Sequence, residues 1–310
     1  MTRRRGFALL TSLWCVVAIT VLAFEVARVA RGDRLATANA IDATHARAAA
    51  TAGIEHARAL LTTALRTADP ARGPRDPWLA LVARRDSVLL DGASYTLTLR
   101  DDGATLDVNR ADADALRALF IACGADAPVA ARSALRVMDF IDADSLSREG
   151  GSEAELYRGA DGSARPRNAP LLTLDALDGI PDLPATPWRC ARSVLSIGGM
   201  GRINVNSAPA PVLRTVPGVS AEVAEAIIAA RTAGTMFVSF NQLLDALPGP
   251  LAASLRRVSD RAESRLTFQV DAVRVLAHGA VPGSPVTIDG EALLTRGGGA
   301  TVFVTWSTQR

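Results

Sequence analysis

The sequence of 310 residues contains no lysine, so arginine supplies all 34 of its basic side chains. The 32 acidic residues nearly balance them, and the net charge at pH 7 is only +2. Arg3, Arg4 and Arg5 stand at the start, and the remainder has 31 basic and 32 acidic side chains. A nucleic-acid-binding domain more often keeps a basic surplus on its folded part. We therefore expect no nucleic-acid partner.

Cysteine and histidine are also scarce, with three residues of each. Cys123 and Cys190 lie outside the apolar N-terminal segment and lack the CxxC spacing of a zinc site. Outside the cytoplasm they could form a disulfide, and two unpaired buried cysteines are an equally good interpretation. The GxSxG, P-loop and dinucleotide-binding motifs are missing. We therefore expect no enzymatic activity.

One long apolar run is present, because the 18 residues from Phe7 to Phe24 carry no charge. A helix of about this length crosses the hydrocarbon layer of a bilayer. The three arginines before it predict a cytoplasmic N-terminus. The residues that follow Phe24 are a poor context for a signal peptidase. The simplest interpretation is a single-pass anchor with the rest of the chain outside the cytoplasm.

Helix-forming sequence continues from the apolar run to about Arg66 and stops before Pro70. A continuous helix over 7–66 would be about 90 Å long. Its last part carries one apolar stripe at helical spacing, formed by Ile54, Ala57, Leu61 and Leu65. This pattern predicts a spine whose first half lies in lipid or a fibre core and whose second half packs under a head. A short coiled coil is the alternative.

Strand candidates lie at both ends of the remaining chain. The first group covers 87–90, 95–99 and 105–108, separated by turns that contain Asp-Gly. The second group covers 266–276, 286–294 and 301–307. Predicted helices fill the space between the two groups. The order predicts an α+β protein in which one antiparallel sheet is interrupted by an inserted helical domain.

The predicted insertion contains an internal echo. Residues 107–117 and 204–214 are identical at six positions, 97 residues apart. Each copy has a Val-Asn pair, and we predict that Asn109 and Asn206 cap the helices that follow them. Each copy is thus expected to form a strand end, a capping loop and a helix.

The second copy continues into a hairpin at 216–220 and a predicted helix over 221–231, which resembles a helix-hairpin-helix unit. Such hairpins bind DNA phosphates through backbone N–H groups of a Gly-x-Gly loop. Here Ser220 replaces the second glycine, and 204–247 has two arginines against three acidic residues. A compact packing unit is favoured. A membrane-anchored, competence-type DNA-binding protein that uses this motif is the alternative function.

The densest group of oxygen-bearing side chains follows the first copy, over 138–157. Calcium binds about six to eight oxygens from carboxylates, carbonyls and water, and a loop of this kind can supply them. The spacing of an EF-hand is missing. The alternative interpretation is a solvated acidic loop that follows a helix ending at Asp139.

The N-terminus resembles the leader of type IV pilins and of type II secretion pseudopilins in the stretch Arg5-Gly6-Phe7-Ala8-Leu9-Leu10. In those families a prepilin peptidase cuts after the glycine and the new first residue is N-methylated. The resemblance implies cleavage after Gly6, methylation of Phe7 and retention of the apolar helix. The fifth residue is then Thr11, where most pilins have Glu. The K-type minor pseudopilins are known for lacking that Glu.

The full order of features resembles the minor pseudopilin K of type II secretion systems (general secretion pathway protein K). It combines the start without Glu, a helix end of the pattern D-[WF]-x-D-x-D at 139–144, two Val-Asn-x-Ala segments and closing strands. The resemblance implies a calcium site whose ligand candidates are Asp142, Asp144 and Glu153, followed by Asp139 and Glu155. Ser152 and Ala154 depart from the pattern of the family within this motif.

The resemblance also implies a pilin-like body with a large inserted α-domain. The expected division is a leader over 1–6, a transmembrane and spine helix over 7–66, a β body over 67–108 and 262–310, and an inserted domain over 109–261. The implied location is the inner membrane, with most of the chain in the periplasm. The implied role is a tip subunit of the secretion pseudopilus. The implied partners are I- and J-type minor pseudopilins and prepilin peptidase.

Overall fold

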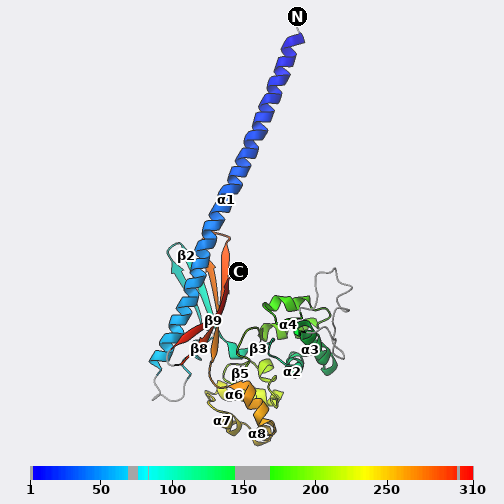
Figure 1. The fold of residues 1–310 in the computed structure, drawn as a ribbon, viewed down its shortest axis with the longest axis vertical. Helices are drawn as coiled ribbons and strands as arrows, with labels where there is room; N and C mark the ends of the chain where they lie inside the picture. Colours follow the sequence, from blue (N-terminus) through cyan, green and yellow to red (C-terminus); the bar gives the residue numbers. More distant parts are fainter. Residues whose placement is uncertain (1–2, 69–75, 83, 144–167, 299–300, 310) are drawn as a thin grey trace.

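The computed structural model describes residues 3–68, 76–82, 84–143, 168–298 and 301–309. Helix α1 (Arg3–Thr67) has 65 residues and forms the long axis of the molecule (Figure 1). Its N-terminal half stands clear of the other elements, and its C-terminal half lies along a sheet. The helix ends three residues before Pro70, which confirms the predicted stop.

The sheet has five antiparallel strands in the order β1-β2-β7-β8-β9. Their bounds are β1 (Arg85–Leu90), β2 (Ala93–Asp101), β7 (Ala272–Ala280), β8 (Thr287–Arg296) and β9 (Val302–Gln309). The predicted hairpin turn joins β1 to β2, and Gly92 supplies the positive φ of 75° that the turn requires. The chain leaves the sheet at the end of β2 and returns at β7, which confirms an interrupted sheet.

Small residues let α1 approach the sheet closely. A Cβ on Gly279 of β7 would lie 2.0 Å from the carbonyl oxygen of Ala46. A Cβ on Gly53 would lie 2.9 Å from the Cβ of Ala277. Farther along α1, toward its C-terminus, the predicted apolar stripe packs on the sheet, and Leu61 is fully buried. The carbonyl of Leu61 also accepts a hydrogen bond of 3.0 Å from Trp78 Nε1. The second half of α1 is therefore part of the core of the body, which comprises this half and the five-stranded sheet.

The inserted region consists of two modules. The first module (residues 106–196) follows η2 (Asp102–Ala104) and contains β3 (Leu106–Asp107), α2 (Ala113–Ala122), α3 (Ala127–Ile141), η3 (Leu174–Gly179), α4 (Ala185–Val194) and β4 (Leu195–Ser196). The second module (residues 203–267) contains β5 (Ile203–Asn204), α5 (Ala210–Leu213), α6 (Ala221–Thr232), α7 (Phe240–Ala246), α8 (Gly249–Arg256), α9 (Ser259–Arg265) and β6 (Leu266–Thr267).

Each module opens with a short strand and closes with a short strand that pairs with it in parallel. Strand β3 pairs with β4, and β5 pairs with β6. The prediction that 105–108 and the whole of 266–276 belong to the main sheet was therefore wrong. Only β7, from the second half of the latter run, joins that sheet. The first two residues of the run, which form β6, close the second module instead.

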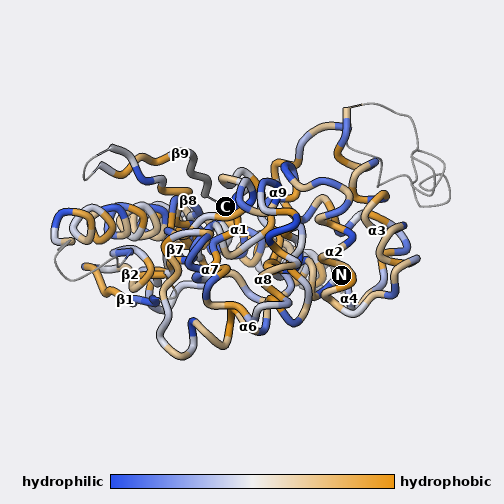
Figure 2. Tube along the Cα trace, turned by 90° about the horizontal axis from the view of Figure 1, so that it is seen from below, coloured by the Kyte–Doolittle hydropathy of each residue, from blue (hydrophilic) through white to orange (hydrophobic). Residues whose placement is uncertain are grey.

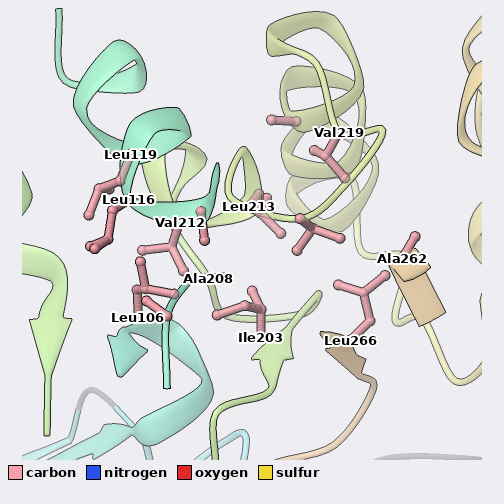
Figure 3. Close-up of a cluster of buried hydrophobic side chains, with 14 of the residues drawn as sticks. Leu106, Leu116, Leu119, Ile203, Ala208, Val212, Leu213, Val219, Ala262 and Leu266 are labelled. Carbon is pink, nitrogen blue, oxygen red and sulfur yellow. The ribbon is translucent and has the colours of Figure 1, made fainter. Parts of the chain in front are cut away.

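The two modules share one apolar core. Figure 3 shows Leu106, Leu116 and Leu119 of the first module beside Val212 and Leu213 of the second. All five side chains are buried. Seen from below in Figure 2, the body and helices α2–α4 lie at opposite sides of the molecule. The insertion therefore forms a head that extends sideways from the body and has a core of its own.

Candidate functional site

The N-terminal half of α1 is a long exposed surface. Every described side chain from Leu10 to Ile41 is exposed, including Trp14 and Phe24. Among the described residues α1 is the one helix that is long and apolar enough to cross a membrane. None of its most apolar stretch is covered by the rest of the molecule. The backbone of Gly6 and Phe7 lies in α1, and cleavage between them stays a prediction.

The first two metal-ligand candidates lie at the C-terminal end of α3. Asp142 is the residue that follows the helix, three positions beyond the predicted end, and Asp139 is fully buried inside the last turn. Asn168 returns to this end, where its N–H donates to the carbonyl of Phe140 at 3.2 Å. The Oδ1 atom of Asn168 is buried and has no hydrogen-bond partner among the described residues. Asn168 thus lies beside the helix end that carries Asp139 and Asp142.

The remaining ligand candidates, Asp144, Glu153 and Glu155, lie outside the described residues. Within the described ranges no group of three or more metal-binding side chains is found. The structure therefore locates the start of the predicted site, and the ligand set stays a prediction.

A disulfide joins Cys123 to Cys190 in the first module. Cys123 caps the C-terminus of α2, Cys190 lies in α4, and their Cα atoms are 5.6 Å apart. Phe120 and Trp188 stack next to the bond, with ring centroids 6.5 Å apart. The bond therefore ties α4, which follows the acidic stretch in the chain, to α2, which precedes it. The third cysteine, Cys15, is exposed on α1.

The two Val-Asn segments have the same local structure. In the first module the side chain of Asp107 accepts from the N–H of Asn109 at 2.9 Å. In the second module Asn204 accepts in the same way from the N–H of Asn206 at 3.0 Å. Both segments directly follow a short parallel strand. The internal echo of the sequence thus corresponds to a repeated structural unit.

The predicted capping role of the two asparagines was wrong. Helix α2 is capped by Asp112, whose side chain accepts from the N–H of Ala115 at 2.8 Å, and α5 has no side-chain cap. Asn109 instead bonds both the N–H and the carbonyl of Leu171, at 2.8 and 3.0 Å. These bonds to backbone far along the chain close the first module.

Asn206 makes the equivalent contacts in the second module. It bonds the N–H and the carbonyl of Phe237, at 2.9 and 2.8 Å, and also the carbonyl of Phe268 at 2.9 Å. A side-chain amide carries both a donor and an acceptor, so it can satisfy both groups of one backbone residue. Each asparagine therefore acts as a latch between distant segments.

A buried acidic cluster connects the body with both modules. Asp101, the last residue of β2, is only 3% exposed. Its carboxylate accepts from Asn204 Nδ2 at 2.6 Å, from the Ser207 hydroxyl, and from the N–H of Gly103 at 2.9 Å. Removal from water raises the pKa of the Asp101 carboxyl to about 6, despite these hydrogen bonds. Burial also raises the pKa of Asp107 nearby.

One arginine of the sheet balances part of the negative charge of this cluster. Arg274 of β7 donates to Asp102 at 2.9 Å, to Glu291 at 2.7 Å and to the carbonyl of Ile197 at 2.9 Å. Asp102 also accepts from the N–H of Met200 at 2.9 Å. A single guanidinium therefore bonds to β8, to η2 and to the segment between the modules. This contact therefore links the insertion to the body.

The hairpin of the second module packs inward. Gly218 has a φ of 81°, and a Cβ there would lie 2.4 Å from Val258 Cγ2. At the start of α6 the Ser220 hydroxyl donates to Glu222 at 2.6 Å, so a carboxylate stands beside the helix N-terminus. Arg231 donates to the carbonyl of Val205 at 3.1 Å, and desolvation lowers its pKa. These contacts disfavour phosphate binding at this hairpin.

Comparison with protein families gives two matches. Residues 95–197, which run from β2 through the first module, match the family model for protein K of the type II secretion system (T2SS). Residues 200–247, in the second module, match a helix-hairpin-helix motif. The fold is similar to a chain in the crystal structure of the GspK-GspI-GspJ complex from the type 2 secretion system of enterotoxigenic Escherichia coli, with a TM-score of 0.65. Residues 95–197 are therefore similar to protein K of the type II secretion system, and the fold of the whole chain is similar to that of the solved relative.

The match to that solved structure has 17% sequence identity and covers 84% of this chain and 94% of the other. No curated protein matches the sequence. This likeness shows that the chain has a pilin-like fold. In this fold α1 and the sheet form the pilin-like part, and the two modules form the insertion.

Proposed function

We propose that the protein is a tip subunit of the type II secretion pseudopilus and supports fibre assembly and export of folded proteins across the outer membrane. The observation that carries the proposal is the protein K match over residues 95–197 on a chain with a long exposed apolar helix. The insertion extends sideways from the body (Figure 1), which suits the end of a thin fibre better than its shaft. The proposed role is structural, and no catalysis is assigned to the chain.

In this proposal α1 anchors the protein in the inner membrane with its N-terminus in the cytoplasm. Prepilin peptidase removes the leader after Gly6, and the amine of Phe7 is methylated. The apolar helix is kept, because it later packs with the helices of other subunits. The parts of this proposal are the spine helix, the body of α1 and the five-stranded sheet, and the insertion, whose two modules cover 106–196 and 203–267.

The proposed partners are I- and J-type minor pseudopilins. The similar solved structure is itself a complex of GspK with GspI and GspJ, which supports this choice. The experiment is co-purification of the full chain with the I- and J-type subunits of the same secretion system, with a major pseudopilin as the control bait. We expect a stable complex of the three minor subunits. Failure of the chain to associate with either minor subunit would contradict the proposal.

We propose in addition that calcium binds at the end of α3 and stabilises the acidic stretch. The buried amide oxygen of Asn168 and the carboxylate of Asp142 are hard oxygen ligands of the type that calcium prefers. Asp144, Glu153, Asp139 and Glu155 are the further candidates. A chelator should lower the melting temperature of the first module, and Asp142→Ala should lower it equally and remove the response to chelator. An unchanged melting temperature with chelator would contradict calcium binding.

The alternative function, a membrane-anchored DNA receptor, is favoured only by the helix-hairpin-helix match. The contacts of Ser220 with Glu222 and of Arg231 with Val205 oppose it, because they occupy the groups that would meet phosphate. DNA binding measured by fluorescence anisotropy at low salt separates the two functions. We expect no binding, and strongly salt-dependent binding would favour the DNA receptor.

A further inference from the structure

We propose that Arg28, Arg31 and Arg34 form a binding site for the phosphate groups of anionic phospholipids at the outer end of the apolar segment. The inference rests on the membrane placement of α1 proposed above and adds the chemical class of the ligand. The three side chains are exposed and lie on one continuous helix.

The position of the arginines along α1 brings them to the lipid headgroups. They follow Phe24, the last residue of the uncharged run, by four, seven and ten positions. At 1.5 Å per residue their Cα atoms lie about 6, 10 and 15 Å beyond Phe24. The headgroup layer extends about 5–8 Å beyond the hydrocarbon on each side. Side chains of a helix lean toward its N-terminus, so these long side chains reach back toward that layer.

The spacing also gathers the positive charge on one side of α1. Residues three apart on a helix differ by about 60° in direction, so the three arginines span an arc of about 120°. Asp33, the acidic residue among them, is exposed and lies about 100° or more from each of the three. The arginines therefore present a cationic face that the carboxylate of Asp33 does not interrupt.

The ion pairs of these arginines leave their guanidinium groups available to bind a phosphate. Glu25 bonds Arg28 at 2.8 Å, and both side chains are about half exposed or more, at 49% and 67%. Ion pairs of this kind contribute little, so a phosphate can replace the carboxylate. Arg31 and Arg34 form no ion pair within the part of the chain that the structure describes. A planar guanidinium donates two parallel hydrogen bonds to a phosphate group, which suits all three side chains to this ligand.

The site matters most after the proposed cleavage at Gly6. Cleavage removes Arg3, Arg4 and Arg5 from the cytoplasmic side, and no charged side chain remains between Phe7 and Phe24. Apart from Glu25, which pairs with Arg28, the outer arginines are then the nearest charged side chains to the bilayer. Their contacts with lipid phosphate hold the subunit in the membrane and must be released when the subunit joins the fibre.

The test measures the lipid preference of the full chain in phosphatidylcholine vesicles that contain about 30% phosphatidylglycerol. This anionic fraction gives the vesicle a negative surface potential. Spin-labelled phosphatidylglycerol and spin-labelled phosphatidylcholine each quench Trp14, which is exposed on the apolar segment. Trp78 lies in the body, Trp188 lies in the head and the backbone of Trp306 lies in β9, so these three give an unquenched background. We expect the wild-type chain to prefer phosphatidylglycerol by at least about threefold.

The test variant carries Arg28→Gln, Arg31→Gln and Arg34→Gln and should show no preference. The control variant carries Arg47→Gln, Arg58→Gln and Arg66→Gln, which removes the same charge from exposed positions farther along α1. Arg47 lies about 35 Å beyond Phe24, so the control should keep the wild-type preference. Lysine at the three test positions should restore most of it, because the charge is kept.

Two results obtained with the variants would overturn the inference. One is an unchanged preference in the glutamine variant, and the other is an equal loss in the control variant. A wild-type chain that inserts with no lipid preference would also overturn it while leaving the anchor intact. A chain that fails to insert into vesicles of either composition would instead remove the proposed membrane placement itself.

Discussion

Arg274 Nη2 lies 2.9 Å from Asp102 Oδ1, and this buried ion pair connects the sheet of the body to the start of the insertion. The two side chains are only 10% and 3% exposed, so neither charge is compensated by water. Glu291 of the neighbouring strand is the second carboxylate of the same guanidinium. The contact therefore places three charged side chains where the body and the insertion meet.

Removing Arg274 should destabilise the protein strongly. Arg274→Met leaves Asp102 buried without its cation, and breaking a buried pair in this way costs about 3–5 kcal/mol. The matched control is Arg192→Met, because Arg192 pairs with exposed carboxylates of Asp175 and Asp178. We expect the control to lose at most about 1 kcal/mol. Urea unfolding of the two variants measures the difference, and equal losses would contradict the role given to Arg274.

The disulfide should contribute substantially to the stability of the first module. Its cysteines are 67 residues apart in the sequence, and closing a loop of this size stabilises by about 4 kcal/mol on the chain-entropy estimate. The double variant Cys123→Ser and Cys190→Ser should therefore melt at a lower temperature. Reductant should bring the wild type to the same melting temperature, whereas Cys15→Ser should change nothing. Three reactive thiols in the denatured, unreduced wild type would show that the bond is absent.

Stability should fall as the pH rises through the titration range of Asp101. Its pKa in the folded state, about 6, lies above its ordinary value of 3.8, so the folded protein holds the proton to higher pH than the unfolded chain. The contribution is most favourable below the unfolded pKa and decreases until the pH exceeds the folded pKa. Burial raises the pKa of Asp107 as well, which acts with the same sign.

The measurement is the melting temperature between pH 4 and pH 7.5, a range of about two units on either side of the shifted pKa. Asp101→Asn should reduce this pH dependence, although it lowers stability overall by disturbing the hydrogen bonds to Asn204 and Ser207. Asp91→Asn, in the exposed turn between β1 and β2, is the control and should keep the wild-type profile. An unchanged profile in Asp101→Asn would show that another group titrates.

The latch of the second module should be sensitive to truncation. Asn206→Ala removes three hydrogen bonds and leaves the backbone groups of Phe237 without partners, which we expect to cost about 2–4 kcal/mol. Asn241→Ala, at an exposed position of α7, should be neutral within about 0.5 kcal/mol. Chemical denaturation compares the two. A neutral Asn206→Ala would contradict the latch.

The sequence predicted the elements whose signals are local. The uncharged run predicted the apolar half of α1 and Pro70 predicted its end, because apolar length and a missing N–H act within one segment. The turn at Gly92 identified the β1–β2 hairpin for the same reason. The interrupted sheet followed from the order of these local signals, and the family resemblance followed from motifs that are also contiguous.

What the sequence did not show depends on contacts between distant segments. The strands β3 to β6 have two residues each, too few to give a periodic pattern, so their parallel pairing could not be predicted. Asn109 and Asn206 have the residue type and position of helix caps, but their partners lie 62 and 31 residues away. Arg274 gave no signal in the sequence, because its role exists only once β7 stands beside η2. The echo of the two Val-Asn segments was the one available hint of the latches.

The central claim is that the apolar helix is trimmed at its cytoplasmic end and then kept. The most direct test is the mass of the N-terminal peptide from the full-length protein extracted from membranes of cells that contain prepilin peptidase. The account predicts a chain that begins with N-methylated Phe7 and retains the whole of α1 beyond it. An intact Met1 on the membrane protein, or a soluble chain that lacks the apolar segment, would contradict it.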